Sequence, residues 1–296
     1  MRKMEIRKLK KKLLKEEQRH RRRKSKAYRL LRRAIPALLI LLLAGGAWEL
    51  YRREGRDLKY YARAEEQQLA GRYQEAARLY KKLQRRHPAS PKADEALYRL
   101  GQIRQLQFKS YPEAILAYLS LEKDYPHSPL AGEALRQVAD LYKNQLLDYP
   151  RAIVIYQKLL DRGTTEADAV QYQIADCYFR LNNFEQARIE FENLLKNYPE
   201  TSLGAEVSYR LAVNLALQGE GKKAIELFTQ VEERWPESPY AVEARFGRAG
   251  VLEDRDDLGG ALRLLEGLRG SYPNGEILKQ RISQVKTRIK KKTQGL

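Results

Sequence analysis

The sequence predicts an all-α solenoid of about six helix-turn-helix repeats, preceded by one transmembrane helix. Three observations predict it: an alanine that recurs every 35 to 38 residues, apolar positions at helical spacing around each alanine, and one apolar run near the amino terminus. The alanines that set the register are Ala76, Ala114, Ala152, Ala187, Ala224 and Ala261. Such a period indicates stacked helical units, because each unit buries its apolar face only against its neighbours.

Each register alanine marks the second helix of its repeat. Large apolar residues follow it by four and seven positions on the same helix face, as Tyr80 and Leu83 do in the first repeat. In five repeats a proline twelve positions after the alanine ends the helix, because proline has no amide proton and clashes with the preceding turn. These prolines are Pro88, Pro126, Pro199, Pro236 and Pro273. In the third repeat Gly163 stands eleven positions on, and glycine is the other common helix terminator.

The first helix of each repeat carries a small residue where the two helices cross. These residues are Ala64, Gly101, Ala139, Ala175, Ala212 and Ala249. Three of these helices are preceded by a serine and a proline, which predicts a hydroxyl N-cap followed by proline at the first helical position. The three pairs are Ser90-Pro91, Ser128-Pro129 and Ser238-Pro239. The second and third repeats are about one residue longer, so their register is less well fixed.

With these residues in place, the sequence resembles the tetratricopeptide repeat family over about three-quarters of the chain. The family's pattern of small, aromatic and proline positions is filled in order by Ala175, Tyr178, Ala187, Phe191, Leu194 and Pro199. The resemblance implies the fold and a role in binding other proteins. The segments 125–135 and 235–244 are more particularly similar to periplasmic bacterial members, of the outer-membrane assembly and Tol-Pal-associated kind. No cysteine follows the apolar run, so the lipid anchor of the assembly lipoproteins is not expected.

The net charge of +19 belongs to the two ends of the chain. Residues 1–33 carry a net +14 and residues 277–296 a net +7, which leaves a net −2 for everything between them. We therefore expect four parts: a basic cytoplasmic arm at 1–33, a transmembrane helix at 34–51, a solenoid at 57–275, and a last helix with a basic tail at 276–296. The charge is not that of a nucleic-acid-binding domain, because the predicted folded region is nearly neutral.

The apolar run from Ala34 to Tyr51 predicts a membrane anchor. Its eighteen residues include one charge, Glu49, and a helix of this length spans about 27 Å, close to the thickness of a hydrocarbon core. The basic residues before it predict that the arm stays in the cytoplasm and that the repeats lie outside. A cleaved signal peptide is the alternative, since Gly45-Gly46-Ala47 resembles a cleavage site. The arm either binds anionic lipid or acts only in setting the topology.

The sequence shows no constellation for catalysis, a cofactor or a metal. The single cysteine, Cys177, excludes an intrachain disulfide and fits a buried apolar position. The three histidines have no ligand spacing, and the acidic loop at 254–257 lacks the glycine and final glutamate of a calcium loop. We therefore expect no enzyme activity, no small-molecule substrate and no cofactor.

The predicted binding surface is the concave face formed by the first helices. The residue three positions before each small residue should point into it, and the residue one position after should flank it. The candidate residues are Tyr61, Glu65, Tyr98, Gln102, Arg136, Asp140, Tyr172, Asp176, Tyr209 and Phe246. Aromatic side chains with interleaved acids suit a protein segment, whereas a clamp for carboxyl termini would need lysine and asparagine. The alternative is that these tyrosines pack between neighbouring repeats.

Together these features predict a non-enzymatic, membrane-anchored scaffold that binds protein segments in its groove. The expected location is a bacterial inner membrane, with the amino terminus in the cytoplasm and the repeats in the periplasm, where they organise a cell-envelope complex. Two alternatives remain open. One is a periplasmic protein with a cleaved signal, acting in outer-membrane assembly or Tol-Pal and division coordination. The other is a receptor on the surface of an organelle.

Overall fold

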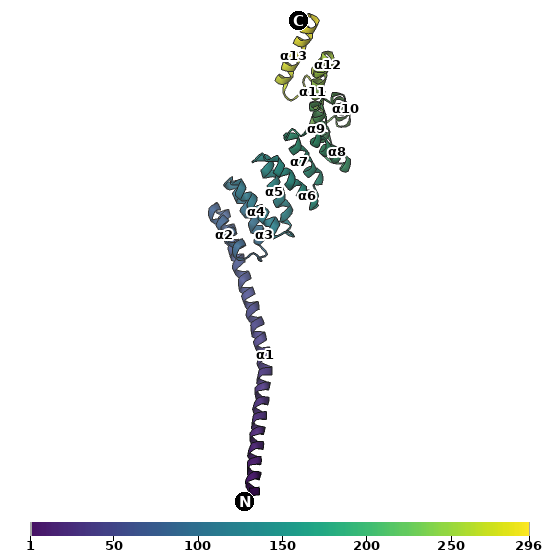
Figure 1. Ribbon diagram of the computed structural model, residues 1–296. Helices are drawn as coiled ribbons and strands as arrows, with labels where there is room; N and C mark the ends of the chain where they lie inside the picture. The colour runs from purple at the N-terminus through teal and green to yellow at the C-terminus, as the bar shows by residue number, and fades with distance from the viewer. Residues whose placement is uncertain (1, 296) are drawn as a thin grey trace. The chain divides into compact units, whose positions relative to one another are not determined.

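The computed structural model describes residues 2–295, without the side chains of residues 2–4, 6, 22–37, 47, 49–54 and 56. All regular elements in this described part are helices (Figure 1). They fall into two compact units, residues 1–96 and residues 97–296. The predicted all-α fold class is therefore confirmed.

A single helix, α1 (Arg2–Leu69), takes up most of the first unit. The sequence predicts an arm, a membrane helix and the start of a solenoid over this range, but α1 runs through all three without a break. The reason lies in the sequence between 47 and 69, which has no proline and only one glycine, Gly55. The chain turns only at Gly71, whose φ of 72° is readily available to glycine.

Within the described residues, no helix has the length and the apolar character needed to cross a membrane. The predicted segment 34–51 lies inside α1, and the side chains of residues 34–37, 47 and 49–51 fall outside the description, as do those of several residues in the basic arm. The apolar side chains from Leu38 to Leu43 are described, and each is 54–69% exposed.

Helix α2 (Tyr73–Arg86) completes the first unit by packing on the end of α1. Its Tyr80 ring is fully buried and lies 5.7 Å from the ring of Tyr61 in α1. The Tyr80 hydroxyl donates a hydrogen bond to Gln68 Oε1 at 3.1 Å. Ala64 and Ala76 have no exposed surface, so the two small residues lie buried between the helices as the repeat pattern predicts.

The second unit is a run of helices in which each packs on the next along the chain (Figure 1). Helix α3 (Ala93–Gln102) begins in the first unit and ends in the second, where it continues as the π-helical turn η1 (Ile103–Gln107). The following helices are α4 (Tyr111–Asp124), α5 (Leu130–Asn144), α6 (Tyr149–Asp161), α7 (Ala167–Arg180), α8 (Phe184–Asn197), α9 (Gly204–Leu217), α10 (Gly221–Arg234), α11 (Pro239–Asp254), α12 (Leu258–Gly267) and α13 (Gly275–Thr293).

The register alanines lie where the sequence places them. All six have no exposed surface, and the large residue four positions after each is at most 1% exposed. The large residues are Tyr80, Tyr118, Tyr156, Phe191, Phe228 and Leu265. Each fills the space between the two helices of its own repeat, which is possible only because the alanine lets the backbones approach closely.

The extra residue of the second and third repeats is absorbed at the end of the first helix. In the second repeat it forms η1, in which the Phe108 amide donates to Ile103 O at 3.2 Å. In the third repeat the Leu146 amide donates to Leu141 O at 3.0 Å, again five residues back. These wider turns add one residue without shifting the second helix, which explains the 38-residue spacings.

The second helices end as predicted in five repeats. In four of them the helix ends before an aromatic residue whose amide donates to the carbonyl four residues back, and the predicted proline comes next. These aromatic residues are His87, Tyr125, Tyr198 and Trp235. Helix α6 of the third repeat ends at Asp161, and Gly163 follows with a φ of 81°.

Three helix boundaries differ from the prediction. Helix α3 begins at Ala93, two residues after the predicted start at Pro91, although the Ser90 hydroxyl accepts from the Lys92 amide at 3.3 Å. Helix α12 ends at Gly267, six residues before Pro273, because the Leu268 amide turns back to Leu265 O and Gly270 adopts a positive φ. Helix α5 begins at Leu130, one residue later than expected, although the Ser128 hydroxyl still accepts from the Leu130 amide at 3.1 Å.

The crossing glycine of the second repeat gives a test of the packing. A Cβ atom at Gly101 would lie 2.5 Å from Cε1 of the buried Tyr118 ring, so something would have to move. We expect Gly101→Ala to destabilise the chain by about 1–3 kcal/mol through overpacking. The measurement is the melting temperature of the full chain in detergent, followed by circular dichroism.

The matched control is Gly250→Ala, also within a first helix. Its Cβ would meet only the end of the Arg281 side chain, at 3.6 Å, so the better helix propensity of alanine should raise the melting temperature slightly. A Gly101→Ala chain that melts at or above the wild type would contradict the close approach.

Candidate functional site

The predicted groove aromatics lie on the first helices, and each packs on a ring of its own repeat. Tyr209 also packs on Tyr240 of the next repeat at 5.6 Å, as the alternative of packing between repeats predicts for this residue. The ring of Tyr98 lies 5.6 Å from Tyr118, that of Tyr172 lies 6.1 Å from Phe191, and that of Tyr209 lies 6.0 Å from Phe228. The Phe246 ring stacks on Tyr272 at 4.6 Å. These four are half-buried, whereas Tyr61 in the first unit is only 5% exposed. Tyr61 is therefore a core residue, and the other rings are anchored while one edge stays accessible.

A glutamate of the next first helix acts on each of three of these tyrosines, through a hydrogen bond at Tyr172 and through its charge at Tyr98 and Tyr209. The Tyr172 hydroxyl donates a hydrogen bond to Glu206 Oε1 of α9 at 2.5 Å. Burial, and to a smaller extent this hydrogen bond, raise the pKa of Tyr172. Burial and then the charge of Glu133 raise the pKa of Tyr98. Burial, and to a smaller extent the charge of Glu243, raise the pKa of Tyr209. The result is a tyrosine–glutamate ladder along the first helices of the second unit.

Sequence reasoning missed these glutamates, although a signal for them exists. Glu133, Glu206 and Glu243 each stand six positions before the small crossing residue of their repeat. On a helix that offset puts them beside the predicted groove position, three residues further on. A search restricted to the aromatic position and its flank could not find them.

The predicted flanking residues have different roles. Glu65 is exposed, and Gln102 accepts a hydrogen bond from Arg99 Nη1 at 3.3 Å. Asp140 accepts from the hydroxyl of buried Tyr156 at 2.5 Å. Asp176 is 4% exposed and cannot contact a partner directly. A binding role for this set stays a prediction, and for Asp176 the structure gives a structural role instead.

Asp176 ties α7 to α5 through a buried ion pair. Its Oδ2 atom lies 2.6 Å from Lys143 Nζ and 2.7 Å from Arg180 Nε. Burial disfavours its charge, but the hydrogen bonds and charges of Arg180 and Lys143 outweigh burial and hold the pKa of Asp176 below its usual value. The next residue, Cys177, is fully buried as expected, and burial raises its pKa to about 11.

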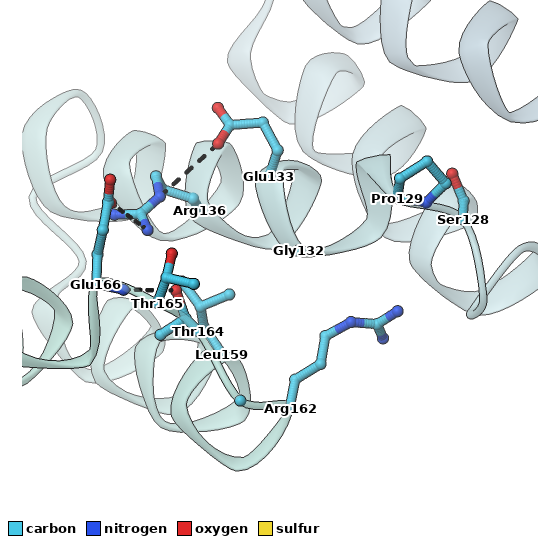
Figure 2. Close-up of a pocket in the computed structure, with 11 residues that line it drawn as sticks. Ser128, Pro129, Gly132, Glu133, Arg136, Leu159, Arg162, Thr164, Thr165 and Glu166 are labelled. Atoms are coloured by element: carbon cyan, nitrogen blue, oxygen red, sulfur yellow. Dashed lines mark hydrogen bonds and ion pairs between the residues drawn. The ribbon is translucent and has the colours of Figure 1, made fainter.

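Arg136 lines a pocket of about 450 Å³ between α5 and the turn that follows α6 (Figure 2). Its guanidinium lies between two carboxylates, with Nη2 2.7 Å from Glu166 and Nε 3.7 Å from Glu133. Gly132, Leu159 and Gly163 form part of the lining. Among the described residues, no group of three or more His, Cys, Asp or Glu side chains is placed to hold a metal ion.

The repeated pair of antiparallel helices defines an α-solenoid repeat protein, and comparisons with known proteins identify the family. A tetratricopeptide repeat model matches residues 61–129 and 209–276, and a second one matches residues 169–201. Together these matches cover more than half of the chain. The chain belongs to the tetratricopeptide repeat family. Residues 130–168, which contain most of the pocket lining, lie outside all three matches.

Solved structures are similar in fold at low sequence identity. A tetratricopeptide repeat protein from Parabacteroides merdae is 19% identical with a TM-score of 0.53, covering 78% of this chain and 87% of its own. YrrB, described as having an unusual peptide-binding site, is 14% identical with a TM-score of 0.51, covering 69% and 97%. PilW, a type IV pilus biogenesis factor, is 15% identical with a TM-score of 0.50, covering 76% and 98%. No curated protein matches.

The ion pair of Asp176 predicts a stability effect that depends on pH. Because the folded pKa is lowered, the contribution of Asp176 is present above the unfolded pKa of about 4 and is lost as the pH falls through the folded pKa. We expect Asp176→Asn to destabilise the chain by about 3 kcal/mol at pH 7, since it leaves the Lys143 charge buried and without its carboxylate. The difference in the free energy of unfolding between wild type and Asp176→Asn should become smaller as the pH falls below 4.

Urea unfolding at several pH values measures both effects. The control is the double variant Lys143→Met with Asp176→Leu, in which an apolar pair replaces the charges. It should recover most of the lost stability. A difference in the free energy of unfolding between wild type and Asp176→Asn that stays constant from pH 7 to pH 3 would contradict the lowered pKa of Asp176.

Proposed function

We propose that this chain is a non-enzymatic adaptor that binds segments of other proteins on the first-helix face of its repeats and is held in a bacterial inner membrane by α1. The observation that carries the binding role is the tyrosine–glutamate ladder of the second unit. Its rings are fixed by the second helices. Its carboxylates are fixed at Glu206 by the Tyr172 hydroxyl, at Glu133 by Arg136 and at Glu243 by the Tyr272 hydroxyl. Such a surface is ordered before a partner arrives.

The chemistry of the ladder suits a polypeptide. Tyrosine offers a large, rigid contact area with a polar tip at a low entropy cost, and carboxylate oxygens with spare lone pairs can accept from backbone amides or basic side chains. The family's members act through protein interactions, and YrrB is described as a peptide-binding member. The envelope role follows from the membrane and linker signals in the sequence, since the likeness to PilW extends to the fold alone.

The membrane part of the proposal has its support in α1. Six consecutive apolar side chains, Leu38 to Leu43, point in all directions around the helix and are all more than half exposed. In water this surface would cost about 25 cal/mol for each Å² of apolar area. A hydrocarbon environment removes that cost, and the basic residues of 1–33 favour an arm on the cytoplasmic side.

The proposed binding face can be tested by photo-crosslinking in intact membranes. We expect p-benzoylphenylalanine at Val213 or Arg210, on the first helix α9, to crosslink a discrete partner protein. Placed instead at Lys222 or Glu226, which are exposed on the second helix α10, p-benzoylphenylalanine should not crosslink this partner. Tyr172→Phe combined with Glu206→Gln removes one rung of the ladder while keeping the ring on Phe191, so it should lower the crosslinking yield at Val213 severalfold.

Equal melting temperatures for the variant and the wild type are the control for folding. Crosslinks of equal yield on both helices, or none from α9, would refute the proposed binding face.

The proposed topology can be tested with a carboxy-terminal alkaline phosphatase, which is active only outside the cytoplasm. We expect activity in the full chain. Leu41→Arg with Leu42→Arg should release the chain from the membrane fraction, because each arginine at the centre of a helix costs about 2.5–3.5 kcal/mol to insert. The matched control is Leu41→Val with Leu42→Val.

A reporter active only in the cytoplasm would rule out this topology. Amino-terminal sequencing of the mature chain would distinguish a retained anchor from a cleaved signal.

A further inference from the structure

The pocket beside Arg136 occupies a place that an aromatic ring fills in the other repeats. Eleven positions after the register alanine the sequence has an aromatic residue in five repeats: His87, Tyr125, Tyr198, Trp235 and Tyr272. The third repeat has Gly163 at this position. Glycine has no side chain, and its φ of 81° also turns the chain differently there. The third repeat therefore lacks the ring that closes the end of its helix pair.

The fifth repeat shows where the missing ring would lie. Trp235 lies over Gly204 of α9, and a Cβ atom at Gly204 would be only 3.0 Å from Cζ2 of the indole. Counted from the crossing residue of the first helix, Gly204 matches the buried Ala131 of α5, and Gly132 is the next residue along that helix. A Cβ atom there would meet only Leu159 Cδ1, at 3.9 Å. The space above Gly132 is therefore open, and it forms the pocket of about 450 Å³ in Figure 2.

The sixth repeat shows what a ring in this place would contact. There the ring at the Gly163 position, Tyr272, stacks on the ring at the groove position, Phe246, at 4.6 Å and an angle of 16°. In the third repeat the groove position holds Arg136, whose planar guanidinium is fixed by Glu166 and Glu133. A guanidinium stacks on an aromatic ring much as another ring does, with an added attraction between the charge and the π-system.

From this template we propose that the pocket receives one aromatic side chain of the bound protein segment, which stacks on Arg136 above Gly132 and Leu159. This inference rests on the proposed function, because it concerns a segment held on the first-helix face. The lining explains the preference for a ring over an aliphatic side chain. The lining combines an apolar part at Pro129, Gly132 and Leu159 with polar side chains, among them the flat cation of Arg136, on which a ring can stack and an aliphatic side chain cannot.

The first experiment tests the pocket without a partner protein. Full-length chain labelled with ¹⁵N-glycine, in lipid nanodiscs, is titrated with N-acetyl-L-tryptophanamide and with N-acetyl-L-leucinamide. We expect saturable shifts of the Gly132 and Gly163 amides with the tryptophan compound, and at least tenfold weaker binding of the leucine compound. Equal binding of the two compounds, or no shift at these glycines, would overturn the proposal.

Two substitutions at Gly132 form a matched pair. Gly132→Leu fills the pocket from α5, whereas Gly132→Ala removes the glycine but leaves the space open. Gly132→Ala should not harm folding, because the added Cβ makes only an ordinary contact. In Gly132→Leu the rest of the side chain has the space of the pocket to occupy. We expect the shift of Gly163 to be lost with Gly132→Leu and kept with Gly132→Ala, at melting temperatures no lower than wild type. Loss of the Gly163 shift in both variants would overturn the proposal.

The second experiment separates this inference from the proposed function. The Val213 crosslink should fall at least tenfold in Gly132→Leu and stay unchanged in Gly132→Ala. An unchanged crosslink in Gly132→Leu, with no glycine shift from the tryptophan compound, would overturn the pocket assignment and leave the binding face intact. No crosslink in wild type would instead overturn the proposed function. If Gly132→Leu abolishes self-association in analytical ultracentrifugation, a second copy fills the pocket and the partner assignment fails.

Discussion

One constraint governs each repeat: two helices must cross with almost no side chain between them. The register alanine and the small residue of the first helix meet this requirement, and both are fully buried in repeat after repeat. Close backbones leave a defined space for one large residue, such as Tyr118 or Phe228, which then has a single place to lie. The groove rings rest on these buried rings. The small size of the crossing residues therefore also sets the geometry of the outer face.

The same logic explains what the sequence could predict. Buried residues recur because every repeat solves the same packing problem, so Ala187 and Phe191 can be identified from spacing alone. The proline or glycine stop predicted the helix end in five repeats. At α12 the helix ends before Tyr272 and Pro273, because Gly267 and Gly270 offer an earlier turn. The continuity of α1 was not predicted. Its apolar and polar segments suit different environments and were expected to be separate elements, although no residue between them ends the helix.

The candidate site was less predictable, because its properties depend on contacts between repeats. Helical spacing put Asp176 beside the groove, but its environment is set by Lys143, thirty-three residues earlier on another helix. The Tyr172–Glu206 bond likewise joins residues thirty-four positions apart. A pocket made by the absence of a ring has no motif at all. It becomes visible only when Gly163 is compared with the residues at the same place in sister repeats.

The burial of Cys177 has a practical consequence. It is the only cysteine of the chain, it has no exposed surface, and its raised pKa keeps it protonated at neutral pH. Thiolate is the reactive form, so maleimides and methanethiosulfonates should pass over it while the fold is intact. A single cysteine introduced at an exposed position can therefore carry a spin label or a fluorophore without prior replacement of the native thiol.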